Sequence, residues 1–326
     1  MAASNCLVPV RGTGTKGSLV VDHPRLRVGV TGAGRVGSVI AAKLRASGHD
    51  IVAVSGSSDA SRTRIETMLP GVDVLAPASV ADRSDVLVLA VPDDVLVEVV
   101  SRLAADGHLR PGQLVVHTSG RHGTNALRAA RRVGARVIAM HPAMTFTGAD
   151  VDVDRLDGCV FGLTADSAER DVAESLVAAL GGSAMWVAED QRALYHASLA
   201  HGSNHLVTLV SQAMALLRRA GAEDPAAVLQ PLLQAALDNA LAYGDAALTG
   251  PVVRGDVTTV EAHLAALADA PASTLGSYLA MAAATADHAV ADGRLSHERA
   301  DELRDLLGGT AQSHLRSNDV DNSARR

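Results

Sequence analysis

Three glycines in the spacing G-x-G-x-x-G lie at Gly32, Gly34 and Gly37, a spacing typical of a turn that binds a dinucleotide. The turn follows an apolar run that predicts a strand and precedes residues 38–46, which predict a helix closed by Gly48. The first glycine would make the turn, the second would let the backbone approach a pyrophosphate, and the third would let the helix pack on the strand. The N–H groups and positive dipole end of the helix would then face the phosphates. The alternative is a glycine-rich turn without a ligand. The residues predicted to bind the phosphates are Gly32, Ala33, Gly34, Arg35, Val36 and Gly37.

The end of the second predicted strand, at 49–54, indicates which dinucleotide would bind. NAD sites usually carry Asp or Glu here for the ribose 2′-OH, whereas NADP sites carry small polar groups and an arginine for the 2′-phosphate. Residues 55–58 read Ser-Gly-Ser-Ser, and no carboxylate precedes Asp59. The sequence therefore favours NADP(H), with a plain turn and solvated arginines as the alternative. The residues expected around the ribose are Ser55, Ser57, Ser58 and Arg62.

Polar residues also follow the strands predicted at 85–91, 113–117 and 136–140. Ligands of open parallel sheets bind beyond the carboxyl ends of the strands, so these residues should share one edge. His117 at this edge could act as a general acid near neutral pH. His141 precedes Pro142, which holds its backbone extended. Either histidine could instead be structural. The residues expected beside the nicotinamide are Val91, Pro92, Thr118 and Ser119.

A long helix predicted at 190–219 carries several polar residues in an apolar context. At about 100° per residue, His196 and Ser203 lie about 20° apart on the helix, and Asn204 lies about 80° from His196. We predict that His196 supplies a proton and Asn204 orients a substrate, with a buried polar pair as the alternative. His201 and His205 have the i, i+4 spacing of metal ligands. No Asp, Glu or Cys nearby in the sequence completes such a set, so we predict no metal site. The candidate catalytic residues are His196, Asn204, His117 and Ser119.

The order of the predicted elements indicates two domains. Strands alternate with helices as far as residue 187, which predicts an α/β fold with a doubly wound, mostly parallel Rossmann sheet. Only helices are predicted afterwards, at 190–219, 226–243, 257–268, 273–291 and 296–307. Within the first part, further strands are expected at 72–75, 159–164 and 185–187, and helices near 125–133 and 167–180. The predicted division is a flexible leader at 1–23, an NAD(P)-binding domain at 24–188, a helical substrate and dimerisation domain at 189–309, and a flexible tail at 310–326.

Composition excludes several other classes of protein. The 326-residue chain has a net charge of −7 and no basic block, which argues against a nucleic-acid partner. Its two cysteines form no disulfide framework, so a reducing cytoplasm is expected. No apolar run approaches the length of a membrane span. The alanine-rich helical part should bury its apolar faces against a second copy, which predicts a homodimer.

Several segments together resemble a known group of oxidoreductases. They are Ala90-Val91-Pro92-Asp93, His117-Thr118-Ser119-Gly120, His141-Pro142-Ala143-Met144-Thr145-Phe146, Tyr195-His196 with Ser203-Asn204, and Ala247-Leu248-Thr249-Gly250-Pro251 with Arg254-Gly255-Asp256. They resemble Rossmann-like NAD(P)-dependent oxidoreductases whose C-terminal helical domain is of unknown function. That group is similar to the superfamily of β-hydroxyacid dehydrogenases, ketopantoate reductases and pyrroline-5-carboxylate reductases.

The resemblance implies hydride transfer from a nicotinamide to a small C=O or C=N substrate in the cleft between the domains. One feature departs from the β-hydroxyacid dehydrogenase pattern, which places a lysine about one turn before the asparagine of the long helix. If Asn204 matches that asparagine, the lysine position falls near Ala200, and the only lysines are Lys16 and Lys43. The proton would then come from His196, His201, His117 or water.

These observations lead to three hypotheses. The first is an NADPH-dependent reductase of a small 2-oxo acid, with ketopantoate, and hence pantothenate biosynthesis, as the leading choice. The second is a cyclic imine reductase of the pyrroline-5-carboxylate type, for which a missing catalytic lysine matters less because the imine can arrive protonated. The third is an NADP-binding sensor without catalysis. A substrate carboxylate could be held by Arg254.

Overall fold

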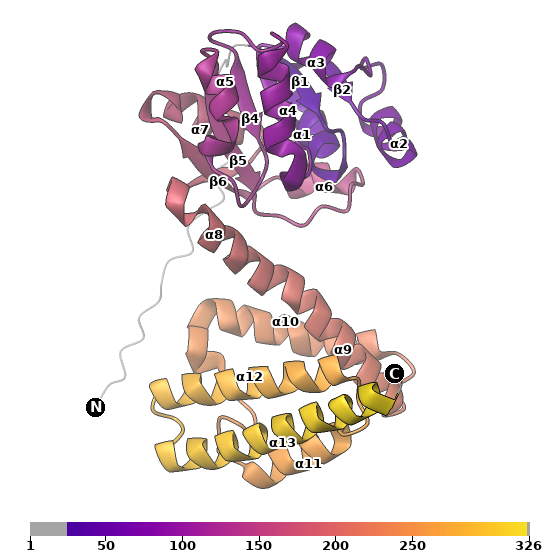
Figure 1. Ribbon diagram of the computed structural model, residues 1–326, viewed down its shortest axis with the longest axis vertical. Coiled ribbons are helices and arrows are strands. Elements are labelled where there is room, and N and C mark those ends of the chain that lie inside the picture. Colours follow the sequence, from indigo (N-terminus) through magenta and orange to yellow (C-terminus); the bar gives the residue numbers. More distant parts are fainter. Residues whose placement is uncertain (1–24, 325–326) are drawn as a thin grey trace, which may run out of the picture. The chain divides into compact units, whose positions relative to one another are not determined.

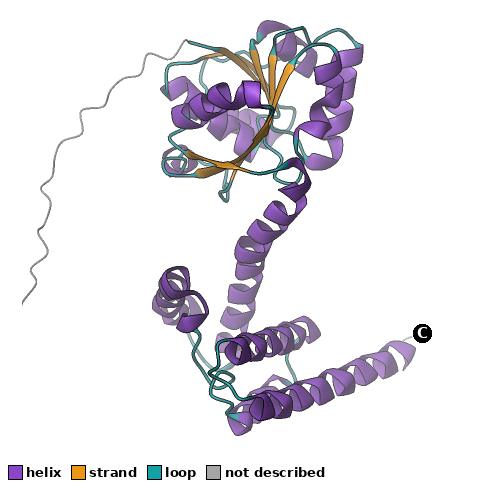
Figure 2. Cartoon of the chain, turned by 90° about the vertical axis from the view of Figure 1, so that its left-hand side faces the viewer, coloured by secondary structure: helices purple, strands orange, loops and turns teal. Residues whose placement is uncertain are grey.

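The computed structural model describes residues 25–324, which form two compact units divided between Ala200 and His201 (Figure 1). The first unit contains strands and helices, whereas the described part of the second contains helices only (Figure 2). The predicted leader at 1–23 lies outside the described residues. The predicted two-part fold, a Rossmann-type sheet followed by helices, is confirmed.

The first unit is built on one seven-stranded sheet with the order β2-β1-β3-β4-β5-β6-β7. Strands β1 to β5 are parallel, β6 is antiparallel to β5, and β7 runs parallel to β6. The strands are β1 Arg27–Thr31, β2 Asp50–Ser55, β3 Val86–Leu89, β4 Leu114–His117, β5 Arg136–Pro142, β6 Val160–Ala165 and β7 Ser183–Trp186.

Helices cover both faces of this sheet and create two apolar cores. Strand β3 reads Val-Leu-Val-Leu and is buried throughout, as expected for a central parallel strand. Its two valines pack into one core with α1 and α7, and its two leucines pack into the other with α3, α4 and α5. The helices of this unit are α1 Arg35–Ala46, α2 Asp59–Met68, α3 Pro77–Arg83, α4 Asp93–Ala105, α5 Arg128–Arg132, α6 Val151–Arg155, α7 Arg170–Ala179 and α8 Arg192–Leu199.

The second unit packs its helices around a core that includes Val260, Leu275 and Leu303. Asp256 caps α11 by accepting a hydrogen bond from the Thr259 N–H at 3.1 Å. No helix among the described residues combines the length and apolarity needed to cross a membrane. The helices of this unit are α9 His205–Arg219, α10 Pro225–Tyr243, α11 Val257–Leu267, α12 Ala272–Ala291 and α13 His297–Ala324.

Two elements of the first unit differ from the sequence prediction. The strand expected at 72–75 is reduced to a single bridge between Val74 and Val54, because Pro77 starts α3 just beyond it. The helix expected at 125–133 begins as a 3-10 turn at Thr124–Leu127 before α5. The Glu189 carboxylate accepts hydrogen bonds from the Thr124 and Asn125 N–H groups and so holds this tighter turn.

The ends of the helical part also differ from the prediction. The units divide after Ala200 rather than at 188, because the buried side chain of Arg192 ties α8 to the sheet unit through backbone carbonyl groups. The predicted tail at 310–326 continues α13 as helix to Ala324, and residues 325–326 lie outside the described part. The long helix predicted at 190–219 is interrupted by a π-helical segment at Ala200–Asn204.

Candidate functional site

Two of the three glycines in the turn between β1 and α1 are required for steric reasons, and the third is not. Gly32 has a φ of +95°, and a Cβ there would lie 2.5 Å from the Ala90 carbonyl oxygen. A Cβ on Gly37 would overlap the Gly32 carbonyl oxygen, so only glycine lets α1 approach β1 this closely. A Cβ on Gly34 would meet nothing within 4 Å. The turn therefore leaves open space at the glycine that was predicted to face a pyrophosphate.

A cavity of about 570 Å³ lies over this turn at the carboxyl ends of the strands. Thr31, at the end of β1, is one of the residues that line the cavity, and its Oγ1 is buried without a hydrogen-bond partner. The N-terminus of α1 begins at Gly34 without a side-chain cap. An orphaned hydroxyl and an uncapped helix N-terminus suit a phosphate-containing ligand. The predicted cofactor residues that line the cavity are Gly32, Ala33, Gly34, Ser55, Ser57, Ser58, Val91 and Pro92, whereas Arg35, Val36, Gly37, Arg62 and Thr118 do not line it.

The start of α2 forms the side of this cavity where the 2′-phosphate is expected. Ser58 caps α2 by accepting a hydrogen bond from the Ser61 N–H at 3.2 Å. Arg62 pairs with Asp59 at 3.3 Å, but both side chains are exposed, so the pair is weak. Arg62 can therefore turn to an anionic group at little cost.

His117 lies buried at the end of β4, where both ring nitrogens make hydrogen bonds to the following loop. Nδ1 accepts from the Ser119 N–H at 3.1 Å, which leaves Nε2–H to donate to the Gly123 carbonyl oxygen at 3.0 Å. Burial lowers the pKa of His117 to about 4, so the ring is neutral near pH 7. In this arrangement His117 shapes the loop and has no N–H left for a ligand. Ser119 is also buried, and its Oγ accepts from the His122 N–H at 3.2 Å.

Arg192 at the start of α8 fastens the same loop to strand β6. Its side chain is 1% exposed and donates to the carbonyl oxygens of Ser119 at 2.7 Å, His122 at 2.8 Å and Gly162 at 3.0 Å. Sequence reasoning missed this residue, because nothing in the local pattern separates a buried arginine from one that starts an exposed helix. All three contacts are made by carbonyl groups distant in sequence.

His141, Tyr195 and His196 come together beside Gly120. The His141 Nδ1 lies 3.0 Å from the Tyr195 hydroxyl, and the His141 ring meets the His196 ring edge to face at 6.0 Å. A Cβ on Gly120 would lie 3.0 Å from His141 Nε2 and 2.6 Å from His196 Cδ2, so the loop must carry glycine here. Burial lowers the pKa of His141 to about 4, and the charge of Arg192 adds to this effect. The predicted His196 thus joins a cluster whose centre is His141.

Asn204 lies in the second unit, on the exposed surface of the π-helical segment. The angles expected for a regular α-helix between His196 and Asn204 do not apply across this segment, because a π-helix advances fewer degrees per residue. His201 and His205 are exposed and hydrogen-bond each other through Nδ1 at 3.0 Å. No group of three or more potential metal ligands gathers among the described residues. The role of Asn204 stays a prediction.

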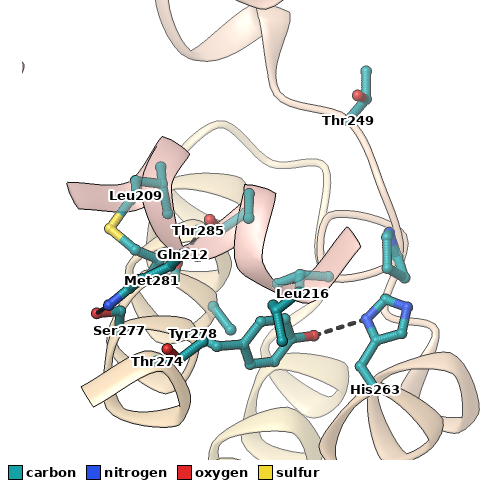
Figure 3. Close-up of a pocket in the computed structure, with 14 residues that line it drawn as sticks. Leu209, Gln212, Leu216, Thr249, His263, Thr274, Ser277, Tyr278, Met281 and Thr285 are labelled. Atoms are coloured by element: carbon teal, nitrogen blue, oxygen red, sulfur yellow. Dashed lines mark hydrogen bonds between the residues drawn. The ribbon is translucent and has the colours of Figure 1, made fainter. Parts of the chain in front are cut away.

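The helical unit has an apolar pocket of about 380 Å³ at the facing sides of α9, α11 and α12 (Figure 3). Its polar centre is a hydrogen bond of 2.9 Å between His263 Nδ1 and the Tyr278 hydroxyl. No Asp, Glu, Lys or Arg of the described chain lines it. The pocket therefore offers no arginine or lysine to a substrate carboxylate.

Comparisons with known proteins agree with this two-part organisation. Residues 12–142 match the Rossmann-like domain, and residues 159–285 match a domain of unknown function, DUF2520. No curated protein matches the chain. The fold and the glycine turn are those of a Rossmann-type domain followed by a helical domain. The chain therefore joins a segment similar to the Rossmann-like domain to a segment similar to DUF2520, in agreement with the resemblance found in the sequence.

Solved structures share the fold at low sequence identity. A Bacteroides fragilis protein provisionally described as an NADP oxidoreductase is 21% identical, covers 81% of this chain and 98% of its own, and has a TM-score of 0.69. The reductive aminase from Aspergillus terreus, in complex with NADPH and ethyl levulinate, is 19% identical. It covers 86% of this chain and 98% of its own, with a TM-score of 0.62. Pyrroline carboxylate reductase from Plasmodium falciparum, with NADP bound, is 12% identical. It covers 87% of this chain and 98% of its own, with a TM-score of 0.53.

Proposed function

We propose that the protein is an NADPH-dependent reductase of a small 2-oxo acid, with ketopantoate as the first candidate. The observation that carries this proposal is the cavity over the glycine turn, with open space at Gly34 and an orphaned hydroxyl at Thr31. Bound NADPH would supply the hydride that reduces the substrate carbon. Ser57, Ser58 and Arg62 would hold its 2′-phosphate.

The substrate carboxylate needs a cation on the loop that follows β4. Arg192 is already committed to three carbonyl groups. Arg121 is exposed, adjoins Gly120 in sequence, and makes no hydrogen bond or ion pair within the described residues. We therefore infer that Arg121 binds the carboxylate, a role for which Arg254 is the alternative in the other unit.

The test is NADPH oxidation, followed by absorbance, over a panel of 2-oxo acids and uncharged ketones of similar size. We expect turnover of the acids, a raised KM for them in Arg121→Gln, and an unchanged KM in the matched variant Arg128→Gln on α5. The Asn204→Ala variant should lose turnover if Asn204 orients the substrate. Tight NADPH binding with no turnover on any carbonyl or imine would contradict the proposal and favour an NADP-binding sensor.

A cyclic imine or a ketone–amine pair is the second candidate substrate class. Two structural relatives are a reductive aminase and a pyrroline carboxylate reductase, and this supports including imines in the panel. The sheet unit also lacks a free lysine among the described residues, because Lys43 pairs with Asp157 at 2.7 Å. An imine that arrives protonated needs no such donor. Turnover of cyclic imines without turnover of 2-oxo acids would select this reaction.

We also propose that the protein is a homodimer formed through α10. This helix carries a single charged residue, Asp238, and only Pro225 and Leu229 are buried along its 19 residues. Leu232 is 64% exposed and Leu241 is 80% exposed. A large exposed apolar surface on a helix is normally covered by a partner, and a second copy supplies an equally apolar surface. The free, buried thiol of Cys159 supports a reducing compartment, the cytoplasm.

Sedimentation of a Leu232→Asp, Leu241→Asp variant tests the dimer. We expect a dimer for the unaltered chain and a monomer for this variant, because two carboxylates would be buried unpaired in the interface. Val97→Asp on α4, which alters an exposed valine of the sheet unit, is the control and should leave the mass unchanged. Sedimentation of the unaltered chain as a monomer would refute the proposed homodimer.

A further inference from the structure

His141 ends β5 with one ring nitrogen bonded and the other open. Nδ1 lies 3.0 Å from the Tyr195 hydroxyl of α8. Nε2 faces Gly120 and makes no hydrogen bond within the described residues, although it is not sealed from solvent. The ring therefore connects a half-buried phenol with the loop edge at which a substrate of this site would lie.

The absence of a side chain on Gly120 keeps this edge open. A Cβ at that position would lie 3.0 Å from His141 Nε2, closer than ordinary contacts allow. The loop carrying Gly120 is held by Arg192 through the Ser119 and His122 carbonyl groups. The His196 ring lies 6.0 Å from the His141 ring and borders this edge of the loop. The His196 ring makes no hydrogen bond to another described side chain. His141 is thus the histidine of this cluster with a proton source behind it.

We propose that His141 is the catalytic proton donor of the reductase, through Nε2–H, and that Tyr195 is the positioning residue that resupplies its proton. This inference rests on the proposed function. His141 would take the place of the lysine that related dehydrogenases carry and that this chain lacks near Ala200. His196, which the sequence favours for this role, would then border the site without donating.

The carbonyl double bond of the substrate breaks as its carbon gains the hydride and its oxygen gains the proton of His141 Nε2. His141 Nδ1 takes the hydroxyl proton of Tyr195, and water later returns a proton to the tyrosinate. A neutral imidazole can serve as the acid in this way because the developing alkoxide is far more basic than a phenolate.

The charges around the pair favour a neutral His141, and Arg192 offsets part of the cost of a transient tyrosinate. Burial, Arg192 and the neighbouring His196 and His117 lower the pKa of His141, and Asp93 opposes them only weakly. Burial raises the pKa of Tyr195, and the positive charge of Arg192, 5.5 Å from the ring centre, counteracts that rise. Arg192 therefore favours both the neutral imidazole and the phenolate that the relay requires.

Three variants test the relay in kinetic measurements on the full chain. His141→Gln should lower kcat for 2-oxo acids by about 10²- to 10⁴-fold, the usual contribution of a general acid, with little change in NADPH affinity. Tyr195→Phe removes only the hydroxyl and should lower kcat by at least about tenfold while KM stays the same. Tyr278→Phe is the matched control, since it removes the hydroxyl of the other His–Tyr pair, and it should leave kcat unchanged.

Two readouts separate this role from a structural one. In ¹⁵N spectra of histidine-labelled protein without cofactor, His141 should be the neutral Nε2–H form from pH 5 to 8, and Tyr195→Phe should shift the signal of its Nδ1. His141→Gln identifies the signal. An Nδ1–H form would overturn the proposal, because Nε2 would then have no proton to give.

The second readout compares carbonyl substrates with preformed cyclic iminium substrates. Both variants should slow the carbonyl reaction selectively, because an iminium carbon needs only the hydride. Equal loss on both substrates, or full carbonyl activity in both variants, would overturn the relay while leaving the reductase proposal intact. Absence of turnover in the unaltered chain would remove the reductase proposal itself, and the relay with it.

Discussion

Two His–Tyr pairs with nearly the same geometry occur in the two units. His141 and Tyr195 hydrogen-bond at 3.0 Å, with ring centres 5.7 Å apart and planes at 87°. His263 and Tyr278 hydrogen-bond at 2.9 Å, with ring centres 6.0 Å apart and planes at 82°. The local contact alone therefore does not distinguish a reactive pair from a structural one.

The surroundings of the two pairs differ in charge and in burial. His141 lies among Arg192, His196 and His117, and its pKa falls to about 4. His263 and Tyr278 line an apolar pocket to which no Asp, Glu, Lys or Arg contributes in the described chain, and the hydrogen bond lies on an exposed side. Chemistry at pH 7 needs a group whose protonation is controlled by its neighbours. The pair of the sheet unit has such neighbours in Arg192, His196 and His117.

Substituting Arg192 should have the largest effect, on the free energy of unfolding of the sheet unit. Arg192→Met leaves the carbonyl oxygens of Ser119, His122 and Gly162 buried without donors, so the sheet unit should lose about 4 kcal/mol of unfolding free energy. Urea unfolding followed by the fluorescence of Trp186, the single tryptophan, reports this unit. Arg294→Met, which frees exposed carbonyls in the helical unit, is the control and should cost below about 1 kcal/mol by circular dichroism. A comparably small loss for Arg192→Met would show that the loop is held in another way.

Acid should destabilise the sheet unit through His117. The pKa of His117 is about 4 in the folded chain against 6.5 for the free side chain, so the unfolded chain binds a proton that the folded chain refuses. Its contribution is fully present above pH 6.5 and is lost as the pH falls toward 4, by up to about 3 kcal/mol. Urea unfolding at pH 7.5 and pH 4.5 measures the loss. His117→Gln should weaken this pH dependence and His263→Gln should not; the same slope in all three proteins would contradict the assignment.

Gly34→Ala should separate ligand binding from folding. Its Cβ meets nothing within 4 Å, so the fold should tolerate the change, but the methyl group fills the space where the backbone would approach a pyrophosphate. We expect NADPH affinity to fall by at least about tenfold, or about 1.4 kcal/mol, in calorimetric titration. Gly276→Ala on α12, another open position, should leave the affinity unchanged. Equal affinity for both variants would show that NADPH does not lie against the turn.

Reversing the charge of Arg62 should give the smallest effect, on the preference for NADPH over NADH. Arg62→Glu places a carboxylate beside Ser58 and should reduce the ratio of NADPH to NADH affinity by about fivefold, or about 1 kcal/mol, because the site is exposed. Arg218→Glu on α9 makes the same change of charge in the helical unit and controls for the net charge. An unaltered ratio in Arg62→Glu would assign the 2′-phosphate to other residues.

The fold class and the position of the glycine turn could both be predicted from the order of the residues in the chain. A G-x-G-x-x-G between a strand and a helix has few structural solutions, because the first and third glycines each satisfy a steric demand of the backbone. Apolar runs such as 86–89 likewise predict buried parallel strands from local composition alone. The Asp256 cap could be predicted for the same reason, since its partner Thr259 is three residues away.

The fold shows which polar side chains use all their hydrogen-bonding atoms within the protein and which keep one for a ligand. His117 and His141 both follow strands at the same edge, and the sequence does not separate them. In the fold, His117 uses both nitrogens within its own loop, whereas His141 meets Tyr195, 54 residues away. Arg192 depends on carbonyl groups up to 73 residues distant. Burial and hydrogen bonding between segments remote in sequence set these protonation states, so no local pattern in the chain records them.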